Sequence, residues 1–417
     1  MSMKNRLHIV FAGGGTGGHL FPGLAVAEKL SANRPGVRIT FVGTGKPLER
    51  EHVAAAGFDY VSLPSRPLPR RASEAISFVV ENVAGYFAAS RLLQEEHVAG
   101  VVGLGGYASV PMGRAAARRR LPLVLLEQNV VLGKANRWLS RYASLVCTSF
   151  EETEQQIRWH SPVRCTGNPI RSFAANEKFP SLLGREAGGE GSWQSGAAKR
   201  GHIGPIAPHQ GHLPEGHLPE GELGQSRLVV LGGSGGARSL NENIPRALYK
   251  IRHLLAGWEI LHQSGEADLE STRDLYRKFA VDAQVEAFWA NLPVLLADSS
   301  LAICRAGGTT LAELSAVATP AVLLPYPHAA ADHQRKNADI FVAAGAAHLV
   351  DEREITGRLD DHLAELLSRI LSDSDGRAIM AHAMHRMARP HAVAHVAALI
   401  WSLVSSQSRI ARQRTAA

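Results

Sequence analysis

Two segments of this chain share one local pattern: a short apolar run, a glycine-rich turn and an apolar helical segment. The first has its apolar run at residues 7–12, the turn GGGTGG at residues 13–18 and a helical segment at residues 24–30. The second repeats the pattern at residues 227–231, 232–236 and 240–249. Short apolar runs are typical of strands buried in parallel sheets. The sequence therefore predicts an α/β protein with two doubly wound domains rather than one large sheet.

Further apolar runs fit strands of the same two sheets. They lie at residues 38–42, 98–104, 121–126 and 141–148 in the N-terminal half, and at 259–262, 285–288, 301–304 and 321–324 in the C-terminal half. We expect one domain over residues 1–170 and a second over residues 171–390. A long amphipathic helix over residues 391–417 is expected to pack back on the N-terminal domain.

Residues 184–226 differ in composition from the rest of the chain. They are rich in Gly, His, Pro and Glu and contain the tandem repeat GHLPE-GHLPE. Such a segment cannot bury enough apolar area to offset its ordering entropy, which predicts a disordered insertion. A metal site is the alternative, but His209, His212 and His217 lack companion ligands at helical spacing.

Charge and cysteine content restrict the class of protein further. The net charge of +7 suggests an anionic partner of unspecified kind. Three widely separated cysteines, Cys147, Cys165 and Cys304, fit neither a disulfide framework nor a structural zinc site, which favours a reducing compartment. The N-terminus lacks a signal-peptide pattern, and no apolar run is long enough to span a membrane.

The first glycine turn leads directly to His19. Glycines between a strand and a helix let backbone N–H groups approach a pyrophosphate. A dinucleotide-binding domain should also carry an acid at the end of its second strand, but that strand ends in Val42-Gly43-Thr44. The nicotinamide or flavin interpretation is therefore disfavoured. His19 has two interpretations, a neutral general base at the start of a helix or a residue that only caps it.

Three more glycine clusters follow predicted strands, at residues 103–109, 232–236 and 305–310. The cluster at residues 103–109 fits an anion-binding nest or a simple strand-to-helix turn equally well. In the last cluster, Glu313 follows one helical turn later, where a carboxylate can accept ribose hydroxyls while the turn binds phosphates. Four such turns across two halves make phosphate binding the better interpretation of the set.

The order of these motifs resembles one family. The motifs are GGGTGGH at residues 13–19, GGY at 105–107, EQN at 127–129, GNPIR at 167–171, GGS at 232–234, RAGGTTLAE at 305–313 and DHQRKNA at 332–338. Together they resemble the MurG family of N-acetylglucosaminyltransferases. The resemblance covers nearly the whole chain apart from the insertion, and it implies a GT-B fold, in which two Rossmann-like domains flank a cleft.

The resemblance also implies an activity. The family moves GlcNAc from UDP-GlcNAc to the MurNAc C4 hydroxyl of undecaprenyl-pyrophosphoryl-MurNAc-pentapeptide (lipid I), with inversion. This reaction belongs to peptidoglycan synthesis, and so to cell-wall biogenesis, cell shape and cell division. It takes place on the cytoplasmic face of the inner membrane, with the enzyme bound peripherally. No nucleic-acid partner is expected.

Roles of single residues follow from the motif match. His19 is the candidate base, and Glu127 is a second catalytic candidate. The acceptor is expected at Gly105, Gly106 and Tyr107. Trp289 falls where the family uses its backbone to recognise uracil. The predicted donor-binding residues are Thr16, Gly17, Gly18, Asn129, Arg171, Ser234, Trp289, Gly308, Thr309, Thr310, Glu313 and Gln334.

Neither a metal nor another cofactor is expected to be obligatory. Helix N-termini near Ser234 and Thr309 can stabilise a departing diphosphate without a metal. The sequence has no Asp-x-Asp beside a strand, because Asp373-Ser374-Asp375 lies in a polar helix–loop context near the C-terminus.

An apolar stretch from Ala75 to Ala89 has two interpretations. Arginines flank it at Arg66, Arg70, Arg71 and Arg91, and further basic clusters occur at residues 114–120 and 137–141. An apolar helix ringed by arginine suits an anionic membrane surface. The alternative is a buried core helix with solvated arginines around it.

Three other functions compete with the transferase. A UDP-GlcNAc epimerase of the same fold would bind the same donor but would need no lipid patch or acceptor motif. A non-catalytic binding subunit would not need all the donor motifs in one chain. A nicotinamide oxidoreductase would bind NADH.

Overall fold

The computed structural model describes residues 7–69, 71–159, 161–170, 226–233, 236–289 and 291–416, without side-chain detail after residue 406. The predicted insertion lies outside the described residues as far as residue 225. Arg70, Arg171 and Ser234, which carry predicted roles, also lie outside them.

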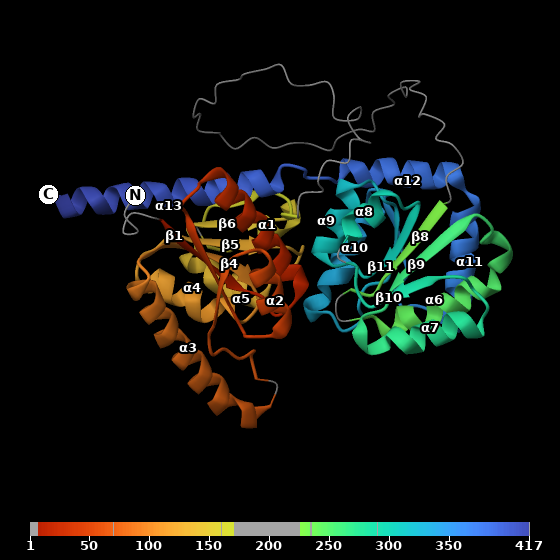
Figure 1. The fold of residues 1–417 in the computed structure, drawn as a ribbon, viewed down its shortest axis with the longest axis horizontal. Helices are drawn as coiled ribbons and strands as arrows, with labels where there is room; N and C mark the ends of the chain where they lie inside the picture. The colour runs from red at the N-terminus through yellow and green to blue at the C-terminus, as the bar shows by residue number, and fades with distance from the viewer. Residues whose placement is uncertain are drawn as a thin grey trace, which may run out of the picture. The chain divides into compact units, whose positions relative to one another are not determined.

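The N-terminal half contains a parallel sheet of seven strands in the order β3-β2-β1-β4-β5-β6-β7 (Figure 1). Its strands are β1 (His8–Gly13), β2 (Arg38–Gly43), β3 (Asp59–Ser62), β4 (Val98–Gly105), β5 (Leu123–Glu127), β6 (Leu145–Thr148) and β7 (Val163–Cys165). Its α-helices are α1 (Gly17–Asn33), α2 (Pro47–Ala55), α3 (Ala75–Glu95), α4 (Ser109–Arg118) and α5 (Lys134–Leu139), with 3-10 turns η2 (Ala72–Glu74), η3 (Ser140–Tyr142) and η4 (Glu151–Gln156).

The C-terminal half contains a second parallel sheet, of six strands in the order β10-β9-β8-β11-β12-β13. Its strands are β8 (Ser226–Leu231), β9 (Trp258–Gln263), β10 (Gln284–Glu286), β11 (Leu301–Cys304), β12 (Ala321–Leu323) and β13 (Ala347–Leu349). Its α-helices are α6 (Arg238–Lys250), α7 (Leu269–Lys278), α8 (Leu292–Ala297), α9 (Gly308–Ala316), α10 (His333–Ala343), α11 (Leu359–Ser372) and α12 (Ser374–Arg386), with 3-10 turns η5 (Arg252–Leu254), η6 (Glu266–Asp268) and η7 (Ala330–Asp332).

Each central strand is buried on both faces, which explains why the sequence shows continuous apolar runs there. In β1, Ile9 and Phe11 belong to one hydrophobic cluster, whereas Val10 and Ala12 belong to another on the opposite face. The strand β8 divides its residues in the same way between two clusters of the C-terminal half. Alternate side chains of a strand point to opposite faces, so a sheet covered by helices on both sides needs apolar residues at every position.

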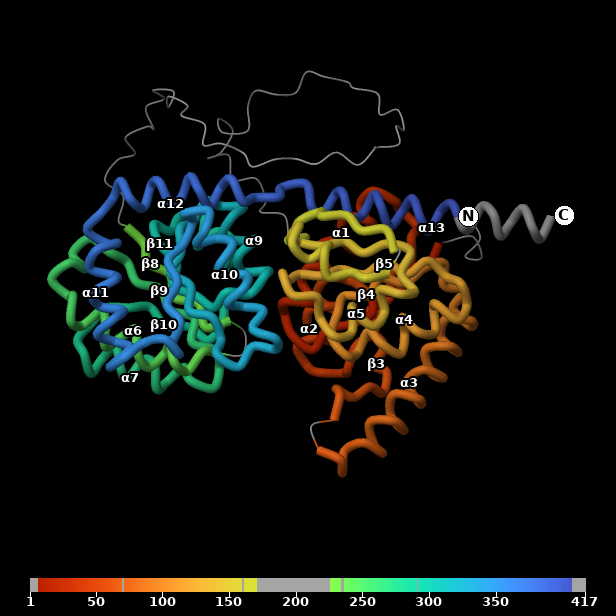
Figure 2. The backbone as a smooth tube through the Cα atoms, turned by 180° about the vertical axis from the view of Figure 1, so that it is seen from behind, coloured from red at the N-terminus to blue at the C-terminus, as the bar shows by residue number. Residues whose placement is uncertain are grey.

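The last helix, α13 (Ala392–Ala416), packs against the N-terminal half (Figure 2). It contacts α1 and β4, and its buried side chains Val396, Ala397, Ile400 and Val404 join the cluster that also holds Phe11. The chain therefore completes its N-terminal core with its final helix.

The strand runs predicted from the sequence are all present in the structure, with small differences at their ends. The helix α1 begins at Gly17, so Gly17 and Gly18 are helical and the first glycine turn is shorter than predicted. The runs at residues 121–126 and 141–148 begin as strands at Leu123 and Leu145. Three strands that we did not predict, β3, β7 and β13, are all edge strands. They are short and only partly buried, so they carry no continuous apolar run.

Candidate active site

The two glycine turns of the N-terminal half meet at the carboxyl ends of β1 and β4. Gly13 pairs in register with Gly105, and a Cβ built on Gly106 would lie 3.0 Å from the carbonyl oxygen of Gly14. The strand order reverses between β1 and β4, and ligands of open α/β sheets bind at such a switch point. The structure thus brings together the predicted residues Thr16, Gly105, Gly106 and Tyr107, which the sequence holds far apart.

His19 lies beside this switch point, in the first turn of α1. Its Nδ1 is 2.9 Å from Thr16 Oγ1. Its ring packs against Gly105, where a built Cβ would lie 2.8 Å from the ring carbon Cδ2. Burial lowers the pKa of His19 to about 4, with a smaller contribution from the charge of His333. The imidazole is therefore neutral near pH 7, the form that can accept a proton from a hydroxyl.

Glu127 ends β5 and is buried within its own loop. Its carboxylate accepts hydrogen bonds from the Gly133 N–H and from Asn136 Nδ2, both at 2.9 Å, and from the Asn129 N–H at 3.2 Å. Burial raises the pKa of Glu127, and these hydrogen bonds oppose the rise. Asn136, which belongs to none of the sequence motifs, donates to both Glu127 and the Leu126 carbonyl.

Several predicted donor residues lie where the two halves touch. Thr309 Oγ1 donates to the Gly18 carbonyl at 3.0 Å, and Asn337 Nδ2 donates to Asn129 Oδ1 at 3.0 Å. A Cβ on Gly308 would overlap the carbonyl oxygen of Gln128, so only glycine fits at that position. The side chain of Thr309 and that of Asn129 are thus hydrogen-bonded within the protein.

The remaining predicted donor residues of this motif lie on helix α9. Thr310 lies in its first turn and Glu313 in its second, and both are partly exposed. Burial raises the pKa of the Cys304 thiol to about 12, and the charge of Glu313 adds to the rise at this residue, which ends β11. This is the switch point of the second sheet, because the strand order reverses between β8 and β11.

Trp289 uses its backbone N–H within the protein. That N–H donates to Gln263 Oε1 at 3.2 Å, and the indole packs partly buried against the core of the C-terminal half. The N–H of Trp289 is therefore already bonded, and its carbonyl is the backbone group left to consider for base recognition.

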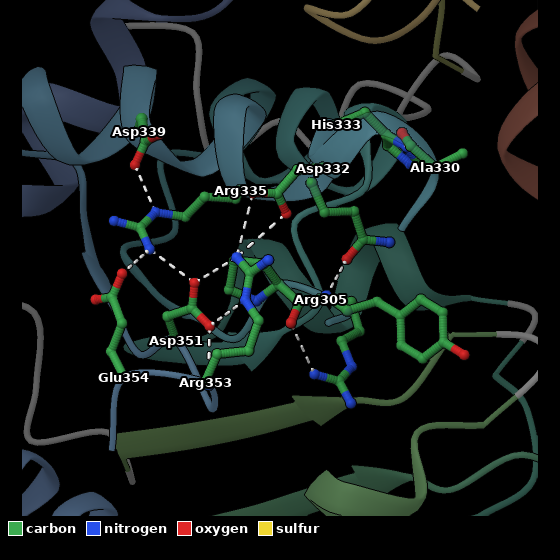
Figure 3. Close-up of polar contacts among 12 residues, drawn as sticks. Arg305, Ala330, Asp332, His333, Arg335, Asp339, Asp351, Arg353 and Glu354 are labelled. Atoms are coloured by element: carbon green, nitrogen blue, oxygen red, sulfur yellow. Dashed lines mark hydrogen bonds and ion pairs between the residues drawn. The ribbon is translucent and has the colours of Figure 1, made fainter. Parts of the chain in front are cut away.

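A network of ion pairs between side chains surrounds the start of α10 (Figure 3). Asp351, whose side chain is 1% exposed, accepts from Arg335 at 2.7 Å and from Arg353 at 2.6 Å. Arg353 holds the pKa of the Asp351 carboxyl well below its usual range, and Arg335 contributes in the same direction. Arg353 also reaches Asp332 at 3.2 Å.

The ion network braces a strained backbone. Ala331 and Asp332 have φ of 52° and 56°, in the left-handed region that non-glycine residues rarely adopt. Two residues later, Gln334 Oε1 accepts from the Tyr326 N–H at 2.8 Å. Arg305 contacts the segments on either side of α10, because it donates to the Leu324 carbonyl at 3.0 Å and to Glu352 at 2.6 Å. The sequence motifs contain Gln334 and Asp332, but not Asp351, the buried carboxylate at the centre of the network.

No cluster of three or more possible metal ligands occurs among the described residues.

Burial raises the pKa of the partly exposed Tyr107, and the charge of Glu49 adds to the rise. Glu49 was not among the predicted residues.

Two parallel-sheet α/β domains, each with a glycine turn at its switch point, are the architecture of the GT-B fold, which many two-domain glycosyltransferases have. Residues 9–148 match the glycosyltransferase family 28 N-terminal domain, and residues 227–396 match the family 28 C-terminal domain. The chain is 34% identical over 368 residues to the UDP-N-acetylglucosamine–N-acetylmuramyl-(pentapeptide) pyrophosphoryl-undecaprenol N-acetylglucosamine transferase of Pelobacter propionicus, which covers 88% of this chain and 92% of that protein. The chain therefore belongs to the family of these N-acetylglucosamine transferases.

Solved structures agree with this assignment. The crystal structure of Acinetobacter baumannii MurG superposes with a TM-score of 0.67 at 26% identity, over 95% of this chain and 99% of that chain. The fold class and the family resemblance inferred from the sequence are thus confirmed. A putative UDP-N-acetylglucosamine 2-epimerase from Listeria monocytogenes, at 13% identity and a TM-score of 0.59 over 96% of each chain, shares the fold alone.

Proposed function

We propose that this protein transfers GlcNAc from UDP-GlcNAc to the C4 hydroxyl of MurNAc in undecaprenyl-pyrophosphoryl-MurNAc-pentapeptide, with inversion. The observation that carries the proposal is the similarity to a relative named for this transfer, at 34% identity over 92% of its length. The motifs of both halves, at residues 13–19 and 305–313, support it. The product would serve peptidoglycan synthesis.

His19 is the base that we assign to the acceptor hydroxyl. It is neutral near pH 7 and stands at the switch point beside Gly105, where we place the acceptor. Thr16 fixes the ring through Nδ1 at 2.9 Å, which directs Nε2 to the reacting hydroxyl. Glu127 is the weaker candidate, because its carboxylate is buried and already bonded to Gly133 and Asn136.

The C-terminal half supplies the donor site in this proposal. The backbone N–H groups at the start of α9 stabilise the departing diphosphate of UDP. Glu313 binds the ribose hydroxyls, Thr310 a phosphate and Gln334 the GlcNAc hydroxyls. Arg171 and Ser234 keep the donor roles expected from their motifs. We expect the transfer to need no obligatory metal or cofactor.

The deciding experiment measures transfer of labelled GlcNAc from UDP-GlcNAc to a lipid I analogue. We expect a disaccharide lipid product that forms only with the lipid acceptor present. In the His19→Ala variant, we expect kcat to fall at least about a hundredfold while the KM for the donor changes little, because a general base acts only in the transition state. Release of a free sugar or an epimerised sugar nucleotide without acceptor would instead support the epimerase.

We further propose that α3 binds the membrane surface. Its apolar side chains Ile76, Val80, Val83 and Phe87 follow the spacing of one helical face and are 48–78% exposed. Its opposite side buries Ala89 and Leu93. An exposed apolar face of this kind favours a lipid surface over the alternative of a buried core helix.

The arginines around α3 contribute less charge than their number suggests. Arg66 pairs with Glu81 at 2.6 Å, and Arg91 pairs with Glu95 at 2.7 Å. The apolar face is therefore the main observation behind the membrane proposal. No helix in the described part of the chain is long and apolar enough to cross a membrane. We place the protein peripherally on the cytoplasmic side, which its free cysteines favour.

A further inference from the structure

Glu49, in the first turn of α2, sends its carboxylate into the first glycine turn. The residue is 1% exposed. Its Oε1 accepts the Gly15 N–H at 2.6 Å, and its Oε2 accepts the Thr44 and Gly45 N–H groups at 2.8 and 3.0 Å. Tyr60 donates its hydroxyl to Oε2 at 2.6 Å. One carboxylate thus joins the loops that follow β1 and β2 with the edge strand β3.

Two glycines leave the space that this carboxylate fills. A Cβ on Gly14 would lie 2.7 Å from Glu49 Oε1, and a Cβ on Gly43 would lie 2.6 Å from Oε2. Gly14 also has a φ of 135°, which few other residues adopt. Both positions must therefore be glycine for Glu49 to occupy its place.

The donors around Glu49 are neutral. Three are backbone N–H groups, and the others are the hydroxyls of Tyr60 and Thr44. Such a set of convergent N–H groups at a strand–turn–helix junction is what binds a phosphate in nucleotide-binding domains. Here it binds a carboxylate of the same chain.

We propose that Glu49 is an internal substitute for a bound phosphate. A second anion at Gly15 would meet the like charge of Glu49, so the Gly15 N–H does not bind the donor diphosphate. The carboxylate instead fixes the backbone of Gly15, and thereby the next residue, Thr16, whose hydroxyl holds His19 Nδ1. Glu49 is a positioning residue for His19. The kinetic part of this inference rests on the proposed function.

In this assignment the negatively charged donor diphosphate binds to the C-terminal half and not to the Gly15 N–H. Thr16, Gly17 and Gly18 are then left to the sugar and the acceptor hydroxyl rather than to the phosphates.

The test replaces Glu49 by alanine and supplies a small carboxylate, formate, in solution. In Glu49→Ala, the three N–H groups face a cavity, and added formate should fill it. We expect formate to raise the thermal midpoint of Glu49→Ala in a saturable manner, but not that of the wild type. Glu51→Ala, on the exposed side of the same helix, is the matched control and should not respond. This readout needs no transfer activity, so it stands or fails separately from the proposed function.

Kinetics then tests the link to His19. We expect kcat of Glu49→Ala to fall at least about tenfold with a donor KM within about twofold of the wild type, and formate to restore part of kcat. Glu49→Gln fills the cavity but sets an amide N–H₂ against backbone donors, so it should lose kcat and show no response to formate. A lowered donor KM with unchanged kcat would instead place a donor phosphate at this turn, because the variant would have lost the like charge. Absence of any formate effect on either midpoint or kcat of a folded Glu49→Ala would overturn the proposal.

Discussion

At the scale of single residues, His262 shows how burial sets a protonation state. It is fully buried in β9, with Nε2 3.0 Å from Asn241 Oδ1 and Nδ1 2.9 Å from the Tyr276 hydroxyl. Asn241 uses its Nδ2 to donate to the Ser264 carbonyl, so its Oδ1 accepts the Nε2–H of a neutral imidazole. Burial lowers the pKa of His262 to about 3, from an ordinary value of 6.5.

This shift predicts a pH-dependent stability. Below pH 6.5 the unfolded chain binds a proton at His262 that the folded protein excludes, so the free energy of unfolding falls as the pH drops toward 3. In that window His262 contributes a slope of about 1.4 kcal/mol per pH unit. Denaturant unfolding of His262→Gln between pH 7 and pH 4 should show a slope that is shallower by this amount. His362→Gln, at an exposed position, is the control and should keep the wild-type slope.

Glu313 provides the residue-scale test of the donor site. Glu313 lies in the second turn of α9, the helix that follows β11 at the switch point of the second sheet. If it binds both ribose hydroxyls, Glu313→Ala should raise the KM for UDP-GlcNAc at least about tenfold, because a carboxylate with two hydroxyl donors contributes more than 1.4 kcal/mol. Initial-rate kinetics with Glu365→Ala, an exposed residue of α11, as the control would check this. Unchanged donor kinetics would remove Glu313 from the ribose site.

At the scale of elements, α3 is distinguished by the face that it leaves uncovered. Ile76 is 78% exposed and Phe87 66% exposed, although both belong to a 21-residue helix. Helices that serve only the core place such residues inward, as α1 does with Leu20 and Leu24. This uncovered face is the observation behind the proposed membrane contact of α3.

A matched pair of substitutions tests that environment. Ile76→Asp should weaken binding to vesicles that contain phosphatidylglycerol by about tenfold or more, since an exposed Ile contributes about 1.5–3 kcal/mol when it enters an apolar phase. Ile379 is 71% exposed on α12, and Ile379→Asp should leave vesicle binding unchanged. Co-sedimentation measures both. Equal loss in the two variants would show a non-specific effect of charge.

At the scale of the whole molecule, the C-terminal helix belongs to the core of the N-terminal half. Ile400 is fully buried in the cluster that contains Phe11 and Leu24, although nearly the whole chain separates these residues in sequence. Folding of the N-terminal half is therefore complete only when α13 is present.

Truncating one side chain of α13 measures this dependence. Ile400→Ala should lower the free energy of unfolding by about 2–4 kcal/mol, because it leaves a cavity in a packed core. Ser402→Ala, exposed on the same helix, should change it by less than about 0.5 kcal/mol. Denaturant titration followed by circular dichroism distinguishes the two. A small effect at Ile400 would mean that α13 contributes little to the N-terminal core.

The sequence alone determined the alternation of strands and helices and the class of fold. Continuous apolar runs such as those of β1 and β8 reflect burial on both faces of a sheet, which local composition records. Edge strands such as β3 escaped prediction because half-exposed residues leave no such run. The order of the motifs, glycine turns and polar motifs such as EQN at residues 127–129 together, also identified the family.

Only the tertiary structure decided which groups of those turns are available to a ligand. The sequence places no acid at the end of β2, yet Glu49 reaches that position from α2 and occupies the Gly15 N–H. In the same way Thr309 contacts Gly18, and the N–H of Trp289 is bonded to Gln263. A motif specifies which donors and acceptors exist. Their partners depend on contacts between residues distant in sequence, which form only when the chain has folded.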